Sequence, residues 1–568
     1  MADINQKAAE AYREKSDIKK TDSGIDLKSF YVSEDVENSV SGDGVSIPGE
    51  YPFTRGIYHD MYRGRLWSSR ELCGYASPEE TNKRIKFLVD SGESAINFIV
   101  DLPTMSGIDS DHPRAKADIG RQGVPLCTIE DAETIIKGIP LDKVSVNVTT
   151  LGLSQPALYI AAVKRAGYSP GVLRGTTVND CLHYWVCGYH APSFPLTWGF
   201  RCSLDWIEYC IKEVPKFNPL SIDAYDYREN GITAIMEVAF ALASAKEYIK
   251  ALLDRGLHID DVAPRVGTVT HSVERDFFEE IAKLRVARKI WAQMVKEQFH
   301  AKSDRALKYK FHIHTAGSSL TMQQPLVNVV RIAYQALAAV LAGCQSLATC
   351  AYDEAIGLPT EESHELAIRT QQVLAHETGV TAVSDPLGGS HYMEWLSNEV
   401  EKKVLEYMEE IERHGGMKKA IETGWVEQEI QETQYKRQKD IEAGKRVVIG
   451  VNKERKPFQE ENIPPAHKVP EEQVENHLNN LERFRKSRNG KLLSESLANL
   501  YQQAKDPAKN LVYPAIEAAE AGATQSEIRG AIRMAYGEHF DPFGQIEPTF
   551  DASFVENNQE KQQSLGQE

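Results

Sequence analysis

Short apolar segments that end in a polar or charged residue recur between residues 95 and 386, with helix-patterned stretches between them. They predict eight strands, at residues 95–101, 144–150, 173–177, 220–226, 262–267, 310–315, 346–353 and 381–386. Strands that alternate with helices pair in parallel through crossovers, and eight such units can close into a barrel. We therefore predict an α/β protein built on a (β/α)8 TIM barrel.

Chemistry in such a barrel takes place where the strands end. The predicted strand ends make the following residues the first candidates for a site: Asp101, Thr149, Thr176, Asp226, Arg265, His314, Asp353 and Asp385.

Polar side chains also follow one face of two predicted strands. Ser145, Asn147 and Thr149 alternate with valines, and Asn97 shares a face with Asp101 on the preceding strand. Ordinary barrels fill their centre with branched aliphatic residues. Because buried polar groups need partners, these rows favour a bore that holds a polar ligand. The alternative is that the rows bond to each other and the barrel is solid.

The remaining sequence divides by composition. We expect a polar N-terminal arm at 1–45, an aromatic and arginine-rich segment at 46–94, the barrel at 95–391, outer helices and a short strand at 392–455, a helical extension at 456–550 and a polar tail at 551–568.

Charge and cysteine usage limit the partners and the compartment. The net charge of −17 argues against nucleic acid or a membrane surface as the main partner. The eight cysteines show no C-x-x-C spacing, which favours reduced thiols. The start of the chain is polar, unlike a signal peptide, and the apolar stretch at 332–352 contains two glutamines. A soluble, cytoplasmic protein is expected.

The segment YPFTRGIYHDMYRGRLWSSRELCGY (51–75) combines arginines, which suit phosphate, with aromatic rings, which suit a purine. It closely resembles the start of the large subunit of the adenosylcobalamin-dependent acyl-CoA mutases, the methylmalonyl-CoA mutase family. The resemblance continues through DLPTMSGIDSDHPRAKADIG (101–120), GTTVND (175–180), DEAIGLPT (353–360) and DPLGGSHYME (385–394).

The resemblance implies a barrel whose bore is threaded by the CoA chain, with a corrinoid over the carboxyl ends of the strands. It implies CoA or substrate contacts at Tyr58, Met61, Arg65, Ser68, Arg70, Thr149, Thr176 and Arg265, and we add Asn97 and Asn147 from the polar rows. It places Glu229, Gly317, Glu354 and Ala355 against the corrinoid or adenosyl group, with Gln345 nearby. The implied reaction is cobalt–carbon homolysis, hydrogen abstraction by the adenosyl radical and a 1,2-shift in the substrate.

Several matched positions depart from the family pattern. Leu72 replaces an aromatic residue that presses on the acyl group, and Val178 and Gly188 replace the glutamine and arginine that grip the carboxylate of methylmalonyl-CoA. Asp226 replaces the histidine that bonds the thioester carbonyl, beside a retained Tyr225, and His314 replaces a glutamine near the adenosyl ribose.

These departures imply a different substrate. Losing a bidentate arginine costs a buried carboxylate several kcal/mol, so methylmalonyl-CoA is disfavoured. The smaller side chains favour a branched or bulky acyl group, such as a pivalyl, isovaleryl or substituted succinyl thioester. Three roles stay open for Asp226: a protonated acid that donates to the thioester, an acceptor for a substrate hydroxyl in a hydroxyacyl-CoA mutase, or a structural partner of Arg228 or another base.

The cobalt-ligating D-x-H-x-x-G motif of fused family members does not occur in the sequence. We expect the cobalt ligand on a separate small cobalamin-binding subunit, with a heterotetramer or other hetero-oligomer as the assembly, and no metal ligand in this chain. Two further alternatives are a catalytically silent barrel subunit and a metal-dependent barrel hydrolase built on His312-x-His314.

Overall fold

The structure is a computed structural model that describes residues 19–28, 31, 35, 47–149, 151–187, 195–466 and 468–550. The chain divides into two compact units. The first unit comprises Met1–Ser69 and Asp223–Pro465, and the second comprises Arg70–Ile222 and Ala466–Glu568.

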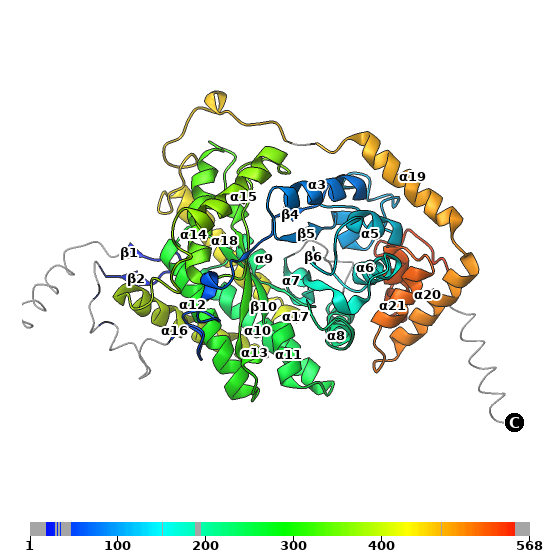
Figure 1. Ribbon diagram of the computed structural model, residues 1–568, viewed down its shortest axis with the longest axis horizontal. Coiled ribbons are helices and arrows are strands. Elements are labelled where there is room, and N and C mark those ends of the chain that lie inside the picture. The colour runs from blue at the N-terminus through cyan, green and yellow to red at the C-terminus, as the bar shows by residue number, and fades with distance from the viewer. Residues whose placement is uncertain are drawn as a thin grey trace, which may run out of the picture. The chain divides into compact units, whose positions relative to one another are not determined.

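The sheet of the first unit has the strand order β3-β12-β11-β10-β9 (Figure 1). Its strands are β3 (Ser68–Ser69), β9 (Ile222–Asp223, at the boundary of the units), β10 (Thr268–Val273), β11 (Lys310–Thr315) and β12 (Ser346–Ala348). The recorded pairings β10–β11, β11–β12 and β12–β3 are parallel, as predicted.

Helices separate these strands in the sequence. They are α9 (Ala224–Glu229), α10 (Ala234–Asp254), α11 (Ile259–Val266), α12 (Phe277–Gln293), α13 (Asp304–Leu307), α14 (Val327–Ala342), α15 (Glu361–His376), α16 (His391–Arg413), α17 (Met417–Glu422) and α18 (Trp425–Glu442). Short turns of helix are η1 (Met61–Arg63), η3 (Met294–Gln298), η4 (Gly317–Ser319) and η5 (Phe458–Glu460). A two-stranded hairpin, β1 (Lys19–Lys20) and β2 (Asp26–Leu27), lies in the predicted arm.

The sheet of the second unit has the order β4-β5-β6-β7-β8, also with parallel pairing throughout. Its strands are β4 (Leu72–Cys73), β5 (Ala95–Ile99), β6 (Ser145–Thr149), β7 (Arg174–Val178) and β8 (Phe217–Asn218). Its helices are α3 (Pro78–Asp90), α4 (Leu102–Ser106), α5 (Ile129–Ile136), α6 (Ser154–Arg165), α7 (Cys181–Val186), α8 (Leu196–Glu213), α19 (Glu471–Ser487), α20 (Gly490–Lys505), α21 (Val512–Glu520) and α22 (Gln525–Ala535), with η2 at Pro170–Val172.

The strand order confirms the predicted fold class. Residues 68–73 supply β3 to one sheet and β4 to the other, and residues 217–223 supply β8 and β9 in the same way. With each of these pairs taken as one interrupted strand, the chain has the eight strand positions of a (β/α)8 topology. The ladders among the described residues remain two five-stranded sheets.

Several predicted strands are wrong in detail. Residues 262–266 belong to helix α11, which Gly267 ends, and the strand is the next segment, TVTHSV, which forms β10. Residues 381–386 form turns, with Asp385 at φ 45° and paired to Arg55 and Arg285. The short strand predicted within 392–455 is instead a turn closed by a single bridge between Ile449 and Lys453. The first strand position of the barrel topology is supplied by β3 and β4, within residues 68–73 of the aromatic and arginine-rich segment.

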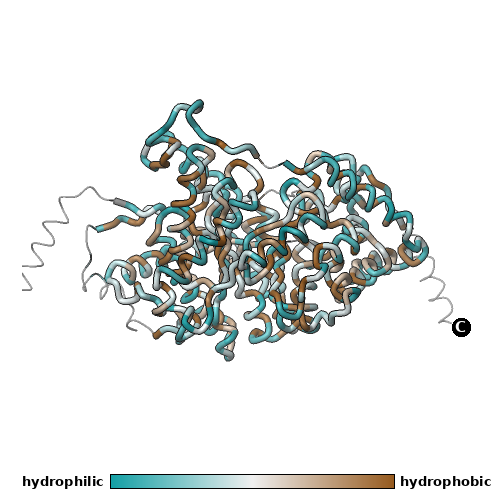
Figure 2. The backbone as a smooth tube through the Cα atoms, turned by 45° about the horizontal axis from the view of Figure 1, so that its top comes forward, coloured by the Kyte–Doolittle hydropathy of each residue, from teal (hydrophilic) through white to brown (hydrophobic). Residues whose placement is uncertain are grey.

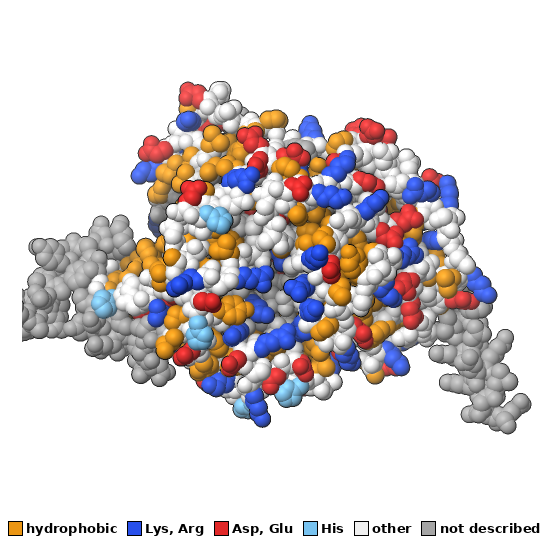
Figure 3. Space-filling model, in the orientation of Figure 1, with side chains coloured by type: hydrophobic (Ala, Val, Ile, Leu, Met, Phe, Trp, Pro, Cys, Tyr) orange, Lys and Arg blue, Asp and Glu red, His pale blue; other side chains and the backbone are white. Residues whose placement is uncertain are grey.

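Figure 2 shows hydrophobic stretches gathered inside each unit and hydrophilic ones along the surface helices. On the face seen in Figure 3, acidic and basic side chains are interspersed along the edge formed by α19 and α20. Within the described part of the chain, every helix is too short or too polar to span a lipid bilayer.

Candidate active site

Helix α9 of the first unit carries three of the predicted site residues, Tyr225, Asp226 and Glu229. The helix begins directly after β9, where the Asp223 side chain accepts a hydrogen bond from the backbone N–H of Asp226 at 3.1 Å. The predicted strand at 220–226 is therefore shorter than expected, because this cap starts a helix at residue 224. The early helix places Tyr225 and Glu229, four residues apart, on the same helical face.

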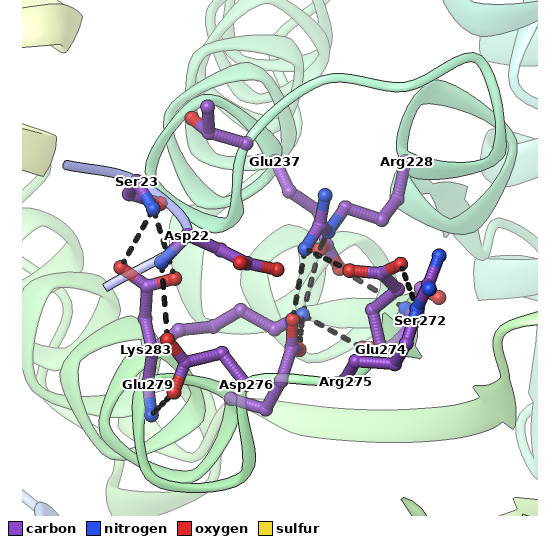
Figure 4. Close-up of polar contacts among 12 residues, drawn as sticks. Asp22, Ser23, Arg228, Glu237, Ser272, Glu274, Arg275, Asp276, Glu279 and Lys283 are labelled. Carbon is purple, nitrogen blue, oxygen red and sulfur yellow. Dashed lines mark hydrogen bonds and ion pairs between the residues drawn. The ribbon is translucent and has the colours of Figure 1, made fainter. Parts of the chain in front are cut away.

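A buried charge network fixes α9 through Arg228 (Figure 4). The Arg228 guanidinium donates to Glu280 Oε1 at 3.0 Å and lies 3.5 Å from Glu237 Oε2 and from Glu274 Oε2. Lys283 also binds this network, with its Nζ 2.6 Å from Glu237 Oε2. Arg228 is 3 % exposed, so these carboxylates satisfy a charge that water does not reach. Arg228 thereby anchors the helix that presents Tyr225 and Glu229.

The N-terminal hairpin closes the other side of the same network (Figure 4). Thr21 donates its hydroxyl hydrogen to Glu279 Oε1 at 2.6 Å, and the backbone N–H of Asp22 donates to Asp276 Oδ2 at 3.0 Å. Burial raises the pKa of Asp276 to about 6 and that of Glu279 to about 7. The hairpin therefore supplies hydrogen-bond donors to carboxyl groups that burial would otherwise leave poorly solvated.

Gly317 is the point at which the predicted cofactor residues meet. It opens η4, just after β11 ends. A Cβ atom built on Gly317 would lie 3.0 Å from Glu354 Oε1, 3.3 Å from the Tyr225 hydroxyl and 3.4 Å from Glu229 Oε2. The neighbouring backbone N–H, that of Ser318, donates to Glu229 Oε2 at 2.5 Å. Three polar groups from two βα units, Tyr225 and Glu229 on α9 and Glu354 after β12, therefore converge on a glycine that carries no side chain.

The environment of this cluster changes the ionisation of its groups. Burial is the main cause that raises the pKa of Glu229 to about 8; the neighbouring Glu354 and Asp226 carboxylates also raise it, and the Ser318 hydrogen bond opposes the shift. Burial and the nearby Glu229 raise the pKa of Tyr225 well above its usual range. At neutral pH Glu229 therefore carries a proton for most of the time and can both donate and accept hydrogen bonds.

His314, at the end of β11, lies beside this cluster. Its ring packs against Tyr225 with centroids 4.6 Å apart, and its Nδ1 lies 2.8 Å from the carbonyl oxygen of Thr315. Cys350 was not predicted from the sequence, yet its Sγ lies 3.7 Å from the same Nδ1. The signal for Cys350 was its place in the SLATCAYD segment, four residues before Glu354.

The second unit aligns a different group of predicted residues. The strand register places Leu72 opposite Asn97, Asn97 opposite Asn147, and Asn147 opposite Thr176. Asn147 donates to Asn97 Oδ1 at 2.6 Å. The polar rows thus bond to each other at this point, as the solid-barrel alternative requires, although Ser145 and Thr149 are partly exposed.

Two other predicted residues of the second unit have defined neighbours. Val178 pairs with Thr149 across β6 and β7. Arg70 is 9 % exposed and donates to Ser145 Oγ at 2.7 Å, and burial lowers the pKa of its guanidinium to about 10. Gly188 lies outside the described residues.

The remaining predicted residues of the first unit are spread over its surface and sheet edge. Tyr58 and Arg65 are exposed, Met61 is buried in η1, and Ser68 pairs with Ser346. Ala355 is exposed beside Glu354.

Two further residues lie at the amino ends of strands. Gln345 precedes β12 and bonds the backbone of Phe311 and Gly343, and buried Arg265 lies in α11 before β10. The placement of Arg265 corrects the prediction that it ends a strand. Gln345 and Arg265 are thus separated from the Gly317 cluster by the length of the sheet.

The hydrolase alternative finds no support in this unit. His312 Nδ1 lies 2.9 Å from Ser346 Oγ, and His314 is held by Thr315 and Tyr225. Among the residues that the structure describes, neither histidine belongs to a cluster of three potential metal ligands.

Comparison with known proteins decides the family. The family model described as methylmalonyl-CoA mutase matches residues 20–538. The chain belongs to the methylmalonyl-CoA mutase family. It is 38 % identical over 512 residues to the 2-hydroxyisobutanoyl-CoA mutase large subunit of Aquincola tertiaricarbonis, and the alignment covers 90 % of each chain.

Methylmalonyl-CoA mutases are also similar to this chain. The protein of Rhizobium meliloti is 39 % identical over 529 residues, covering 91 % of this chain and 72 % of the relative. The human mitochondrial protein is 37 % identical over 522 residues, covering 91 % and 68 %. These relatives make the chain an isomerase of the acyl-CoA mutase family.

The cluster around Gly317 fits the nucleoside part of the family's cofactor. The cluster offers a bare backbone position, two carboxyl groups and a phenol within 3.4 Å of the missing Cβ. A ribose needs such acceptors and donors for its hydroxyls, and a flat base needs a backbone without a side chain.

Proposed function

We propose that this chain is the substrate-binding large subunit of an adenosylcobalamin-dependent acyl-CoA mutase that rearranges the carbon skeleton of a branched or bulky acyl-CoA. The observation that carries the proposal is the convergence of Tyr225, Glu229 and Glu354 on Gly317, at the ends of the strands of a family member.

The chain's own residues bind and orient. When bound, adenosylcobalamin supplies the radical that abstracts hydrogen from the substrate. Glu229 and Glu354 hold the nucleoside hydroxyls, and Glu229 donates the proton that its raised pKa retains. Tyr225 and His314 form an aromatic wall that excludes water from the reacting atoms.

The substrate pocket is assigned to the second unit's polar row. Leu72 faces Asn97 across the strand pair, and Val178 faces Thr149. An aliphatic side chain at both positions offers no charge to a free carboxylate, which leaves methylmalonyl-CoA without a bidentate partner. A branched, uncharged acyl group fits this lining.

A hydroxyacyl-CoA mutase is the second candidate. The relative named 2-hydroxyisobutanoyl-CoA mutase large subunit matches over 90 % of both chains, whereas the fused mutases match over about 70 % of theirs. Asp226, on the cluster's helix, offers an acceptor for a substrate hydroxyl.

The partner is a small cobalamin-binding subunit that bears D-x-H-x-x-G. The name of the Aquincola relative, a large subunit, supports a split enzyme. The charged helices α19 and α20 are proposed as part of the docking surface.

The test is turnover of a thioester panel. The full chain, mixed with a small subunit and adenosylcobalamin, is assayed with isovaleryl-, pivalyl-, 2-hydroxyisobutyryl- and methylmalonyl-CoA. We expect kcat/KM for one uncharged substrate to exceed that for methylmalonyl-CoA by at least about 100-fold, the value of a lost bidentate contact. A preference for methylmalonyl-CoA refutes the substrate class, and no turnover with any thioester supports the silent subunit.

A further inference from the structure

Helix α14 of the first unit turns a row of polar side chains toward the protein interior. Asn328, Arg331 and Gln335 are three and four positions apart, so they share one face of the helix. Asn328 and Gln335 are fully buried, and Arg331 is 6 % exposed. The buried face of a helix normally carries apolar residues, and buried polar groups need hydrogen-bond partners. The partners of this row therefore show what it holds in place.

The Asn328 amide is bonded through both its oxygen and its nitrogen. Its Oδ1 atom accepts from the backbone N–H of Thr321 at 3.1 Å and from the Arg331 guanidinium at 2.7 Å. Its Nδ2 atom donates to the carbonyl oxygens of Thr321 and Tyr352, each at 2.9 Å. An amide offers two donors and two acceptor lone pairs, and all of them are used here. The neighbours of Asn328 thus fix both the position and the orientation of its side chain.

These contacts join two loops that carry residues of the proposed cofactor site. Thr321 lies in the loop after β11, four residues beyond Gly317. Tyr352 lies in the loop after β12, two residues before Glu354. One side chain therefore sets the separation of the two loops, and with it the 3.0 Å between Glu354 Oε1 and the Cβ position of Gly317.

The other two residues of the row hold the loop after β11. Gln335 Nε2 donates to Ser319 Oγ at 2.7 Å, and the Ser319 hydroxyl donates to the carbonyl oxygen of Ala316 at 2.7 Å. These two bonds tie the short turn η4 to the helix. Arg331 donates to Thr321 Oγ1 at 3.0 Å, at the end of the same loop. The row therefore fixes this loop at both of its ends.

Apolar packing joins the same three elements. Leu320 after β11, Ile332 on α14 and Cys350 after β12 form one buried cluster, and Tyr352 packs against it. This packing holds the helix against both loops independently of the amide. A change of the Asn328 side chain should thus alter the positions of the loop backbones before it unfolds the unit.

We propose that Asn328, assisted by Arg331 and Gln335, is a positioning residue for cofactor binding, which clamps the loops after β11 and β12 at the spacing that the nucleoside of adenosylcobalamin requires. This inference rests on the proposed function. The three side chains act through the backbone of the loops that carry Gly317 and Glu354, and we assign them no contact with the cofactor.

The test compares Asn328→Asp with Asn82→Asp in the full-length chain. An ionised carboxylate has no donor for the two carbonyl oxygens that each asparagine binds. Asn82, on α3 of the second unit, is 8 % exposed and donates to the carbonyl oxygens of Ile135 and Lys137 at 2.8 and 3.0 Å. Both variants should unfold at a lower temperature than the wild type.

Cofactor affinity distinguishes positioning from stabilisation. With the small subunit present, Asn328→Asp should raise the apparent Kd for adenosylcobalamin about tenfold or more, because its loops are misplaced. Asn82→Asp should keep the wild-type Kd. At saturating adenosylcobalamin, KM for the acyl thioester should change less than about twofold in either variant, because neither touches the assigned substrate pocket.

Hydrogen exchange compares the loops without cofactor. In Asn328→Asp, the amides of 317–321 and of 351–357 should both exchange faster than in the wild type. In Gln335→Leu, which removes only the contact to Ser319, the first segment alone should exchange faster. Gln335→Leu should also raise the Kd for adenosylcobalamin, and it decides the matter if Asn328→Asp does not fold.

A wild-type Kd in Asn328→Asp or in Gln335→Leu would overturn the positioning role. Faster exchange in Asn328→Asp that is confined to one loop would overturn it as well. A wild-type chain that binds no adenosylcobalamin with its small subunit would instead refute the proposed function. The two ideas therefore fail on different measurements.

Discussion

The phenol ring of Tyr225 lies against the imidazole of His314, with centroids 4.6 Å apart and planes inclined by 52°. The two residues come from α9 and β11, which are separated in the chain by α10, α11, β10, α12, η3 and α13. Their contact holds the Tyr225 hydroxyl 3.3 Å from the position that a Cβ atom of Gly317 would occupy. The aromatic pair and the bare backbone thus adjoin each other at the proposed cofactor site.

Gly317→Ala should weaken the binding of adenosylcobalamin while the fold persists. The new methyl group would lie 3.0 Å from Glu354 Oε1 and 3.3 Å from the Tyr225 hydroxyl, so these groups must move. We expect the apparent Kd for adenosylcobalamin, measured spectroscopically with the small subunit present, to rise at least about tenfold, or about 1.4 kcal/mol.

Gly171→Ala is the matched control, because a Cβ atom there makes only ordinary contacts, 3.7 Å from Glu213 O and Ser169 Oγ, in the short turn η2. This change should leave the apparent Kd for adenosylcobalamin unaltered and keep or slightly raise the melting temperature. Equal cofactor affinity in both variants would show that Gly317 lies outside the binding site.

Glu229→Gln should change how stability depends on pH. Burial holds the pKa of Glu229 at about 8, above its unfolded value of 4.5. Between these two values the unfolded chain releases the proton and the native chain keeps it, so the free energy of unfolding falls as pH rises. The glutamine variant lacks this fall in the free energy of unfolding, which amounts to about a few kcal/mol at most in the wild type.

Thermal unfolding of both proteins from pH 5 to pH 9 measures this effect. The melting temperature of Glu229→Gln relative to wild type should increase with pH and level off above pH 8. A difference that stays constant across the range would mean that Glu229 ionises normally in the native protein.

Local patterns predicted five of the strands closely. Strands β5, β6, β11 and β12 lie within the predicted segments, and β7 ends one residue beyond its segment. In β6 and β11 apolar residues alternate with polar ones, which is the pattern of a strand. The segment at 262–267 looked similar, but it lies in helix α11. His258 caps this helix by accepting a hydrogen bond from the backbone N–H of Asp260, and the helix continues through Pro264. The true strand carries Thr270, His271 and Ser272, and its polarity concealed it.

The Gly317 cluster was predicted as a set of residues but not as a geometry. The resemblance supplied Glu229, Gly317 and Glu354, whereas the Arg228 anchor that fixes α9 depends on contacts with Glu274 and Glu280 about 50 residues away. The buried contact between Cys127 and His477 shows the same limit, because the two residues are 350 positions apart and no local pattern joins them.

Arg228→Met should destabilise the first unit and release α9. The substitution leaves Glu237, Glu274 and Glu280 without the guanidinium that they surround. Breaking a buried ion pair on one side costs about 3–5 kcal/mol. Denaturant unfolding should show a loss in this range, together with weaker cofactor binding. Arg413→Met, whose exposed partner Glu410 lies on the same helix, should leave the midpoint unchanged, and equal midpoints for both variants would contradict the anchoring role.

Asp226→Asn separates the three roles of Asp226. An amide still donates a hydrogen bond, so a protonated acid predicts that the variant keeps most of its kcat and loses the alkaline limb of the pH–rate profile. An acceptor for a substrate hydroxyl predicts a drop in kcat/KM of about 10–100-fold that is confined to hydroxyacyl thioesters. A structural carboxylate predicts a lower melting temperature and equal losses for all substrates.

Leu72→Phe tests whether the acyl pocket is enlarged. Leu72 pairs with Asn97 at the edge of the row that continues through Asn147 to Thr176, so a larger side chain narrows the lining beside that row. We expect kcat/KM for a branched thioester to fall about 10–200-fold, the range for a hydrophobic pocket that loses the space of one or a few methylene groups, while a smaller straight-chain thioester is less affected. Leu405→Phe, at an exposed position of helix α16, controls for the added bulk and should leave kcat/KM for both substrates unchanged. Equal kinetics for wild type and Leu72→Phe with the branched thioester would place the acyl group elsewhere, because a ring added beside a bound branched group must displace either the substrate or the strand.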